Sequence, residues 1–118
     1  MSDSIREKSY SFALAIIGFY KKLQACNEYV LSRQLLRSGT SIGANVEEAG
    51  AGQSRADFLS KMSIASKEAR ETRYWLRLVR DSGFVDAKET DPLLSEAESI
   101  INILTAIVKT TAQSKRQF

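Results

Sequence analysis

Residues 54–83 read SRADFLSKMSIASKEARETRYWLRLVRDSG, and their apolar and small side chains recur at heptad spacing. The repeating positions are Phe58, Met62, Ala65, Ala69, Thr72, Leu76 and Val79. A helix with this periodicity buries one stripe against its neighbours, as in a helical bundle. Ser54, followed by Asp57, is a suitable N-cap, and Gly83 suits the position just after a helix C-terminus. We therefore predict a helix over residues 54–82.

Two amphipathic segments precede this helix. Ser4 and Glu7 have the spacing of a capping box, and the apolar positions that follow recur every three or four residues, which predicts a helix over residues 4–25. Asn27 is the expected N-cap of a second helix over residues 28–49, which ends where two glycines supply backbone freedom.

A fourth amphipathic segment follows the only proline of the chain. Proline is favoured at the first helical position, so Pro92 predicts a helix over residues 92–112. Four helices joined by short connections pack as antiparallel neighbours. Residues 1–118 are therefore expected to form a single domain of the all-α class, an up-down-up-down antiparallel four-helix bundle.

The composition of the 118 residues argues against most enzyme classes. The chain has one cysteine, Cys26, and no histidine, so the usual zinc sites and the Ser-His or Cys-His nucleophile pairs are excluded. We expect no catalytic residues, no metal and no cofactor. No apolar run is long enough for a membrane span, and a cytoplasmic location is expected. The net charge of +3 is compatible with nucleic-acid binding without requiring it.

The second predicted helix contains a run of small residues and a polar line. Gly39 and Gly43 each cost about 1 kcal/mol relative to alanine, which indicates that another helix packs closely there. A phosphate-binding loop is disfavoured because the glycines lie within a helix. The polar line is expected to fix the register between helices or subunits rather than to form a ligand groove. Its residues are Gln34, Ser38, Ser41, Asn45 and Glu48.

The third predicted helix carries a row of arginines beside its apolar stripe. The row consists of Arg70, Arg73, Arg77 and Arg80. Like charges at this spacing repel by a few tenths of a kcal/mol per pair, which indicates an external anion. That anion is either Glu47 and Glu48 from an adjoining helix or subunit, or the phosphates of a nucleic acid. Tyr74 and Trp75 lie alongside, where a core or interface role is favoured over base stacking.

Two stretches of the chain resemble a known bacterial family. They are QLLRSGTSIGANVEEAG (residues 34–50) and SRADFLSKMSIASKEARETRYWL (residues 54–76), with the spacing of Ser41, Asn45 and Glu48 as the most specific part. These stretches are similar to the four-helix-bundle proteins encoded by intervening sequences in 23S ribosomal RNA genes, the S23 ribosomal protein family. The resemblance implies a homopentameric ring, no enzyme activity, and a poorly defined role in which association with RNA is inferred from genomic setting.

Two function hypotheses follow. In the first, an oligomeric, non-enzymatic bundle contacts RNA or DNA phosphates through its arginine row. In the second, the oligomer is a scaffold for another protein, and the arginines are neutralised by Glu47, Glu48 or Glu71. Both include self-association, because the first predicted helix is apolar over much of its circumference and the third has apolar side chains outside its stripe. The expected interface residues on the third helix are Ile64, Trp75 and Leu78.

Overall fold

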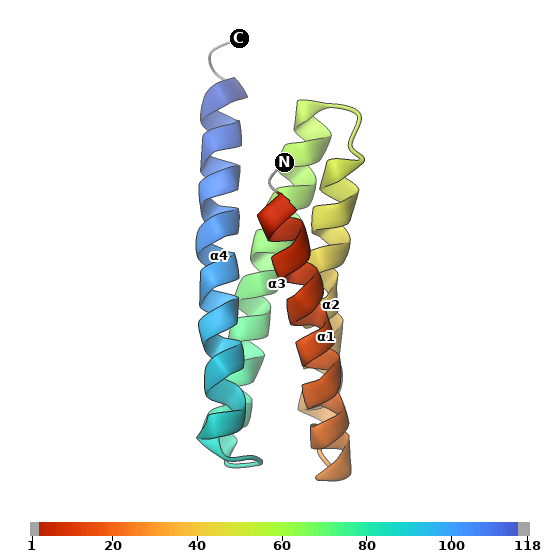
Figure 1. The fold of residues 1–118 in the computed structure, drawn as a ribbon, viewed down its shortest axis with the longest axis vertical. Coiled ribbons are helices and arrows are strands. Elements are labelled where there is room, and N and C mark those ends of the chain that lie inside the picture. The colour runs from red at the N-terminus through yellow and green to blue at the C-terminus, as the bar shows by residue number, and fades with distance from the viewer. Residues whose placement is uncertain (1–2, 116–118) are drawn as a thin grey trace.

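The computed structural model describes residues 3–115, and every regular element in that range is an α-helix. The four helices are α1 (Asp3–Ala25), α2 (Val30–Gly50), α3 (Arg55–Ser82) and α4 (Ala87–Lys115). They run alternately up and down in a bundle 52 Å long and 21 by 20 Å across (Figure 1). Each helix contacts the next one along the chain, and α4 also contacts α1. The predicted all-α, up-down-up-down four-helix bundle is confirmed.

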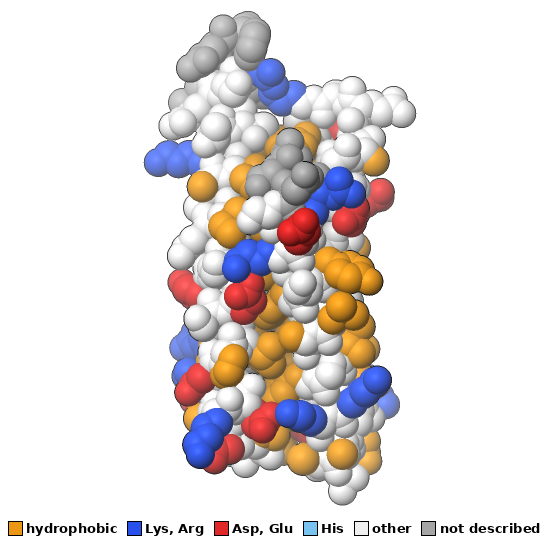
Figure 2. Space-filling view, in the orientation of Figure 1, with side chains coloured by type: hydrophobic (Ala, Val, Ile, Leu, Met, Phe, Trp, Pro, Cys, Tyr) orange, Lys and Arg blue, Asp and Glu red, His pale blue; other side chains and the backbone are white. Residues whose placement is uncertain are grey.

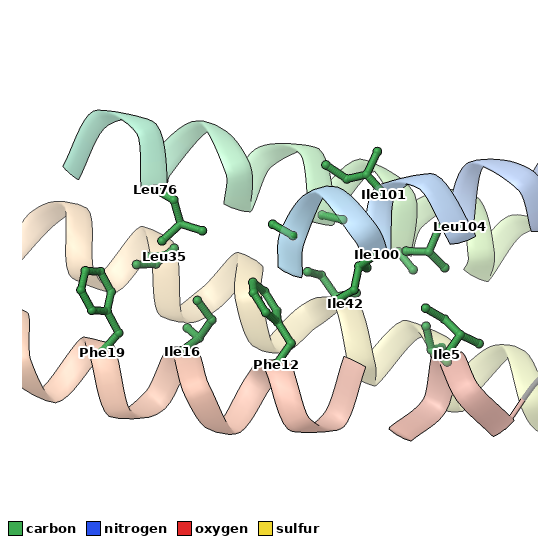
Figure 3. Packing of buried hydrophobic residues seen from close by; sticks show 14 of the residues in the cluster. Ile5, Phe12, Ile16, Phe19, Leu35, Ile42, Leu76, Ile100, Ile101 and Leu104 are labelled. Carbon is green, nitrogen blue, oxygen red and sulfur yellow. The ribbon is translucent and has the colours of Figure 1, made fainter. Parts of the chain in front are cut away.

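One face of each helix forms the core. The side chains of Phe12, Ile16 and Phe19 point from α1 into the bundle, and Leu76 points toward them from α3 (Figure 3). Six of the seven predicted stripe positions of α3, from Met62 to Val79, are buried, and the first is half-buried. The heptad pattern therefore identified the core face of this helix correctly.

The small residues of α2 bring α1 close. A Cβ atom added to Gly39 would lie 2.9 Å from Cγ2 of Ile16, and one added to Gly43 would lie 3.4 Å from the carbonyl oxygen of Ser9. The first distance is too short for a side chain unless the buried side chain of Ile16 or the whole of α1 shifts. The interpretation of this run as a site of close helix packing is confirmed, and the helix that approaches belongs to the same chain.

The caps of α3 are those that the sequence predicts. Ser54 Oγ accepts a hydrogen bond of 3.1 Å from the backbone N–H of Asp57. Gly83 has φ of 74°, a left-handed conformation that glycine adopts without a steric cost. These two residues set the ends of the helix in which the arginine row lies.

The turn between α1 and α2 differs from the prediction. Asn27 is not an N-cap: its φ of 63° ends α1, and the next backbone N–H, that of Glu28, bonds back to the carbonyl oxygen of Leu23 at 2.9 Å. The buried carboxylate of Glu28 caps α2 instead, accepting from the N–H groups of Val30 at 3.2 Å and Ser32 at 2.6 Å. Asparagine tolerates the left-handed region, which is why it also suits a helix C-terminus.

The predicted start of α4 is wrong by five residues, because the helix begins at Ala87 and Pro92 lies inside it. Asp86 is the cap: its Oδ1 accepts from the N–H of Lys88 at 2.9 Å, and its carbonyl oxygen accepts from the N–H of Glu89 at 2.9 Å. An aspartate followed by a glutamate three residues later is an N-terminal signal in its own right. That signal prevailed over the preference of proline for the first helical position.

The start of α1 also differs from the prediction. Because α1 already includes Asp3, Ser4 lies within the helix and is not the cap that was predicted.

Within residues 3–115, no helix combines the length and the apolar character needed to cross a membrane.

Candidate nucleic-acid interface

The arginine row lies along the edge of α3 that faces α4. Nη2 of Arg70 donates to Oγ1 of Thr105 at 3.1 Å, and Nη1 of Arg73 lies 2.9 Å from Oε2 of Glu98. Thr105 and Glu98 both belong to α4. Arg73 is therefore neutralised, whereas Arg70 is bound by a neutral hydroxyl and keeps its full charge available.

The other half of the row divides in the same way. Nε of Arg80 lies 2.8 Å from Oδ1 of Asp81, and this hydrogen bond holds the pKa of the Asp81 carboxyl below its usual range. Arg77 is exposed and makes no ion pair with any described residue. The row thus alternates between available cations, Arg70 and Arg77, and paired ones, Arg73 and Arg80.

The carboxylates proposed from the sequence as partners of the row lie elsewhere within the chain. Oε2 of Glu47 is 2.9 Å from Nη2 of Arg6, Glu71 pairs with Arg37, and Glu48 is exposed. Within one subunit, therefore, none of these three carboxylates pairs with an arginine of the row, and pairing with them across a subunit interface stays a prediction. Sequence spacing along one helix could not reveal Glu98, which approaches from α4.

Lys67 extends the available cations onto the outer surface of α3. It lies three residues before Arg70 and seven before Tyr74, spacings that place all of them on neighbouring parts of one helical surface. We call Lys67, Arg70 and Arg77 the cationic strip. None of the three lies within 4.0 Å of a described carboxylate oxygen. Lys67 is not among the residues predicted from the arginine spacing, although the same helical spacing includes it.

The opposite edge of α3, facing α2, has a different character. Nη1 of Arg37 lies 3.2 Å from Oε2 of Glu68, and Nη2 of Arg37 contacts Oε2 of Glu71. Nε1 of Trp75 donates to the same Glu71 oxygen at 3.0 Å. The hydrogen bond from Trp75, followed by the contact with Arg37, lowers the pKa of Glu71. Charges on this edge are matched within the chain.

The residues of the polar line of α2 have three different surroundings. Ser38 is buried, and its Oγ accepts a hydrogen bond of 2.9 Å from Oγ1 of Thr72 on α3, so this pair does link two helices as expected. Ser41 and Asn45 donate to carbonyl oxygens of α2 itself. Gln34 and Glu48 are exposed. Only Ser38 fixes register within the chain.

The chain matches the model of a known protein family over most of its length. The model of the family described as 23S rRNA-intervening sequence protein matches residues 3–106. The chain belongs to this family. The match includes α1, α2, α3 and most of α4, and hence the whole arginine row.

A solved member of this family has the same fold. A protein of unknown function from the S23 ribosomal protein family of Bacteroides thetaiotaomicron VPI-5482 is 43% identical, with a TM-score of 0.86. The similarity covers 89% of the present chain and 98% of the other. No curated protein matches the chain significantly. Membership of the family therefore establishes the fold, and the evidence on function comes from the side chains on the surface of the bundle.

The present chain also exposes apolar side chains on its surface. Of the interface residues predicted on α3, Ile64 is 39% exposed, whereas Trp75 and Leu78 are half-buried. Larger exposure occurs on α1, at Tyr10 (63%) and Leu14 (54%), one helical turn apart. Hydrophobic side chains are visible on the face where α1 and α4 lie side by side (Figure 2). The sequence predicts surplus apolar surface on α1, and the structure shows that Tyr10 and Leu14 are among the residues that expose it.

The described residues contain no cluster of three or more histidine, cysteine, aspartate or glutamate side chains with the geometry to hold a metal ion. Glu68 and Glu71 lie on one helix edge, but Arg37 occupies the space between their carboxylates. Cys26 is an exposed thiol in the turn after α1.

Proposed function

We propose that this 23S rRNA-intervening sequence protein is a non-catalytic, self-associating bundle that binds RNA or DNA phosphates through the cationic strip of α3. One observation carries the proposal: Lys67, Arg70 and Arg77 share an exposed helix surface and form no ion pair with a described carboxylate, since Glu71 and Asp81 act on Lys67 and Arg77 only through longer-range attraction. Stability does not require such a row of cations, because like charges at helical spacing repel. Phosphates would supply the missing anions.

The paired arginines add to the strip at low cost. The Arg73–Glu98 pair is partly exposed, with side-chain exposures of 36% and 52%, and pairs of this kind are worth about 0 to 1 kcal/mol. A phosphate that displaces Glu98 would recover most of that amount. The strip can therefore widen toward α4 when a nucleic acid binds.

Self-association belongs to the same proposal. Tyr10 and Leu14 form an exposed apolar ridge on α1, and Ile64 adds an exposed apolar side chain on α3. Such surface is usually buried in an oligomer. The resemblance described above suggests a ring of five subunits. Gly39 and Gly43 are not part of the proposed interface, because α1 of the same chain occupies the space beside them.

The rival function is a protein-binding scaffold without affinity for nucleic acid. The ion pairs Arg73–Glu98 and Arg80–Asp81 favour it, because they satisfy half of the arginine row inside one subunit. It predicts that no RNA binds at physiological salt.

The deciding experiment measures binding of a fluorescein-labelled, mixed-sequence RNA by anisotropy between about 0.05 and 0.2 M salt. Replacing Lys67, Arg70 and Arg77 together with alanine should weaken binding and reduce the log-log salt slope by about 0.7 to 0.9 per lost phosphate contact. A matched control replaces Lys21, Arg33 and Lys88, which are exposed, lie on other helices and lack ion pairs among the described residues. It removes the same charge and should bind nearly as the unmodified protein does.

Two results would overturn the proposal. Absence of RNA binding by the unmodified protein favours the scaffold, and equal losses in the two triple variants mean that net charge, not the strip, is responsible. Light scattering tests the oligomer separately: a mass of 13.1 kDa at micromolar concentration would contradict self-association.

A further inference from the structure

Tyr74 is the exposed aromatic side chain nearest to the cationic strip. It lies four residues after Arg70 and three before Arg77, so the three side chains neighbour one another on the helix surface. Along the axis, Arg70 and Arg77 are about 10 Å apart at about 1.5 Å per residue, with Tyr74 between them. Tyr74 is 50% exposed. A large aromatic surface thus lies open to solvent between two cations that form no ion pair with a described carboxylate.

The ring of Tyr74 is supported from within the chain. It makes an edge contact with Trp75, with ring centroids 5.3 Å apart and planes inclined by 65°. The indole of Trp75 is in turn held by Glu71, and Glu71 by Arg37 of α2. Because these contacts restrict the ring before any ligand arrives, less conformational freedom is lost on binding.

The shape of the bundle argues against a duplex as the preferred ligand. α3 is flanked by α2 and α4, and the bundle is 21 by 20 Å across. The major groove of B-form DNA is about 12 Å wide, and that of A-form RNA is too narrow for side chains to read. α3 therefore reaches only the phosphates of a duplex, where the bases are stacked on one another and give Tyr74 no partner. In a single strand, by contrast, an unstacked base can lie on an aromatic ring.

We infer that α3 prefers single-stranded nucleic acid, with one base stacked on Tyr74 and the adjoining phosphates bound by Arg70 and Arg77. This inference rests on the proposed function, because it assigns the ligand class of the same strip. Stacking needs no particular base, since every base has a π-face, so the expected preference is for strandedness and not for sequence.

The test uses labelled single strands of about 12 nucleotides, oligouridylate and oligothymidylate, against a duplex of equal length; sites of comparable single-strand binders span about 4 to 16 nucleotides. Tyr74→Ala should weaken single-strand binding about 5- to 100-fold, corresponding to about 1 to 3 kcal/mol per stacked base at 1.4 kcal/mol per tenfold change. Its duplex binding should not change. Tyr74→Phe keeps the ring and should bind like the unmodified protein. The two single strands separate an RNA preference from a general one.

Tyr29→Ala is the matched control, because Tyr29 is also an exposed tyrosine, 43% accessible, but lies in the turn between α1 and α2 and outside the proposed self-association surface. It should not alter single-strand affinity. Equal affinity for duplex and single strand, or an unchanged affinity in Tyr74→Ala, overturns the inference. If the triple variant of Lys67, Arg70 and Arg77 still loses binding in that case, the proposed function stands and only the stacking role fails. Absence of any binding defeats both.

Discussion

The contact between α1 and α2 and the contact between α3 and α4 show two ways of joining antiparallel helices. Between α1 and α2 the backbones approach closely, because Gly39 and Gly43 have no side chains to hold α1 away. The α3–α4 contact has a buried centre that includes Val79 and Leu104, but its border is lined by arginines. The first contact is closed by small side chains and has one ion pair at its border, Arg6–Glu47, whereas long, charged side chains line the border of the second.

This difference separates structural from functional sequence signals. Each glycine lowers the intrinsic stability of α2, and the close packing of α1 against Gly39 and Gly43 accounts for their presence. Repulsion within the arginine row also lowers the intrinsic stability of α3, yet the chain compensates only half of it, at Glu98 and Asp81. Repulsion between like charges that the folded subunit leaves partly uncompensated is a better indication of a ligand than an unusual amino-acid composition.

The largest expected effect is on the α1–α2 contact. Gly39→Val places a branched side chain where even a Cβ would lie 2.9 Å from Cγ2 of the buried Ile16. Overpacking of this kind costs about 2 to 3 kcal/mol, only slightly offset by the better helix propensity. The free energy of unfolding, from urea titration followed by circular dichroism at fixed protein concentration, should fall accordingly.

Gly18→Val is the control for this substitution. Gly18 also lies within a helix, but apart from its chain neighbours and the nearby backbone of its own helix, no heavy atom would lie within 4 Å of an added Cβ. The variant should unfold within about 0.5 kcal/mol of the unmodified protein. If both valines cost the same, glycine propensity and not helix approach explains the run, and the contrast between the two contacts disappears.

A smaller effect is expected at the α2-facing edge of α3, where charges are matched. Glu71→Gln removes the ion pair with Arg37 and should cost about 1 kcal/mol at pH 7. Because folding lowers the pKa of Glu71 from its usual 4.5, its contribution is complete above that value and is lost as the pH falls toward the lower folded pKa. The difference in stability between the two proteins should therefore shrink on acidification below pH 4.5.

Glu48→Gln provides the comparison for Glu71, because Glu48 is exposed and forms no ion pair with a described residue. It should stay within about 0.5 kcal/mol of the unmodified protein at pH 7. A Glu71 variant whose deficit remained constant down to pH 3 would show that packing of the side chain, not its charge, matters.

The fold was largely predictable because its signals are local and agree with one another. The heptad stripe of α3, the Ser54 cap and Gly83 each depend on residues a few positions apart. The start of α4 was mispredicted because two local signals, Asp86 and Pro92, compete, and no sequence rule states which prevails. Asn27 failed for a similar reason, since asparagine suits both a helix start and a helix end.

The site was only partly predictable, because ion pairs between helices depend on rotation and register. The spacing of the arginines placed them on one edge of α3, but which of them meets a carboxylate is set by α4, 25 positions along the chain in the case of Arg73 and Glu98. Likewise, the surplus apolar surface of α1 could be inferred, whereas the exposure of Tyr10 and Leu14 required the placement of α2 and α4.

The smallest effect on stability, and the closest test of the contrast, is expected from single changes within the arginine row. Arg73→Ala breaks the partly exposed pair with Glu98 and should cost up to about 1 kcal/mol, less at high salt because exposed charges are screened. Arg77→Ala breaks no ion pair among the described residues. It loses a weak, exposed attraction to Asp81 and relieves repulsion from the neighbouring arginines, so its free energy of unfolding should change by less than about 0.3 kcal/mol in either direction. Binding should show the reverse order, with the greater loss of RNA affinity in Arg77→Ala. If Arg77 proves important for stability and irrelevant for binding, the border of α3 and α4 is as structural as the glycine contact.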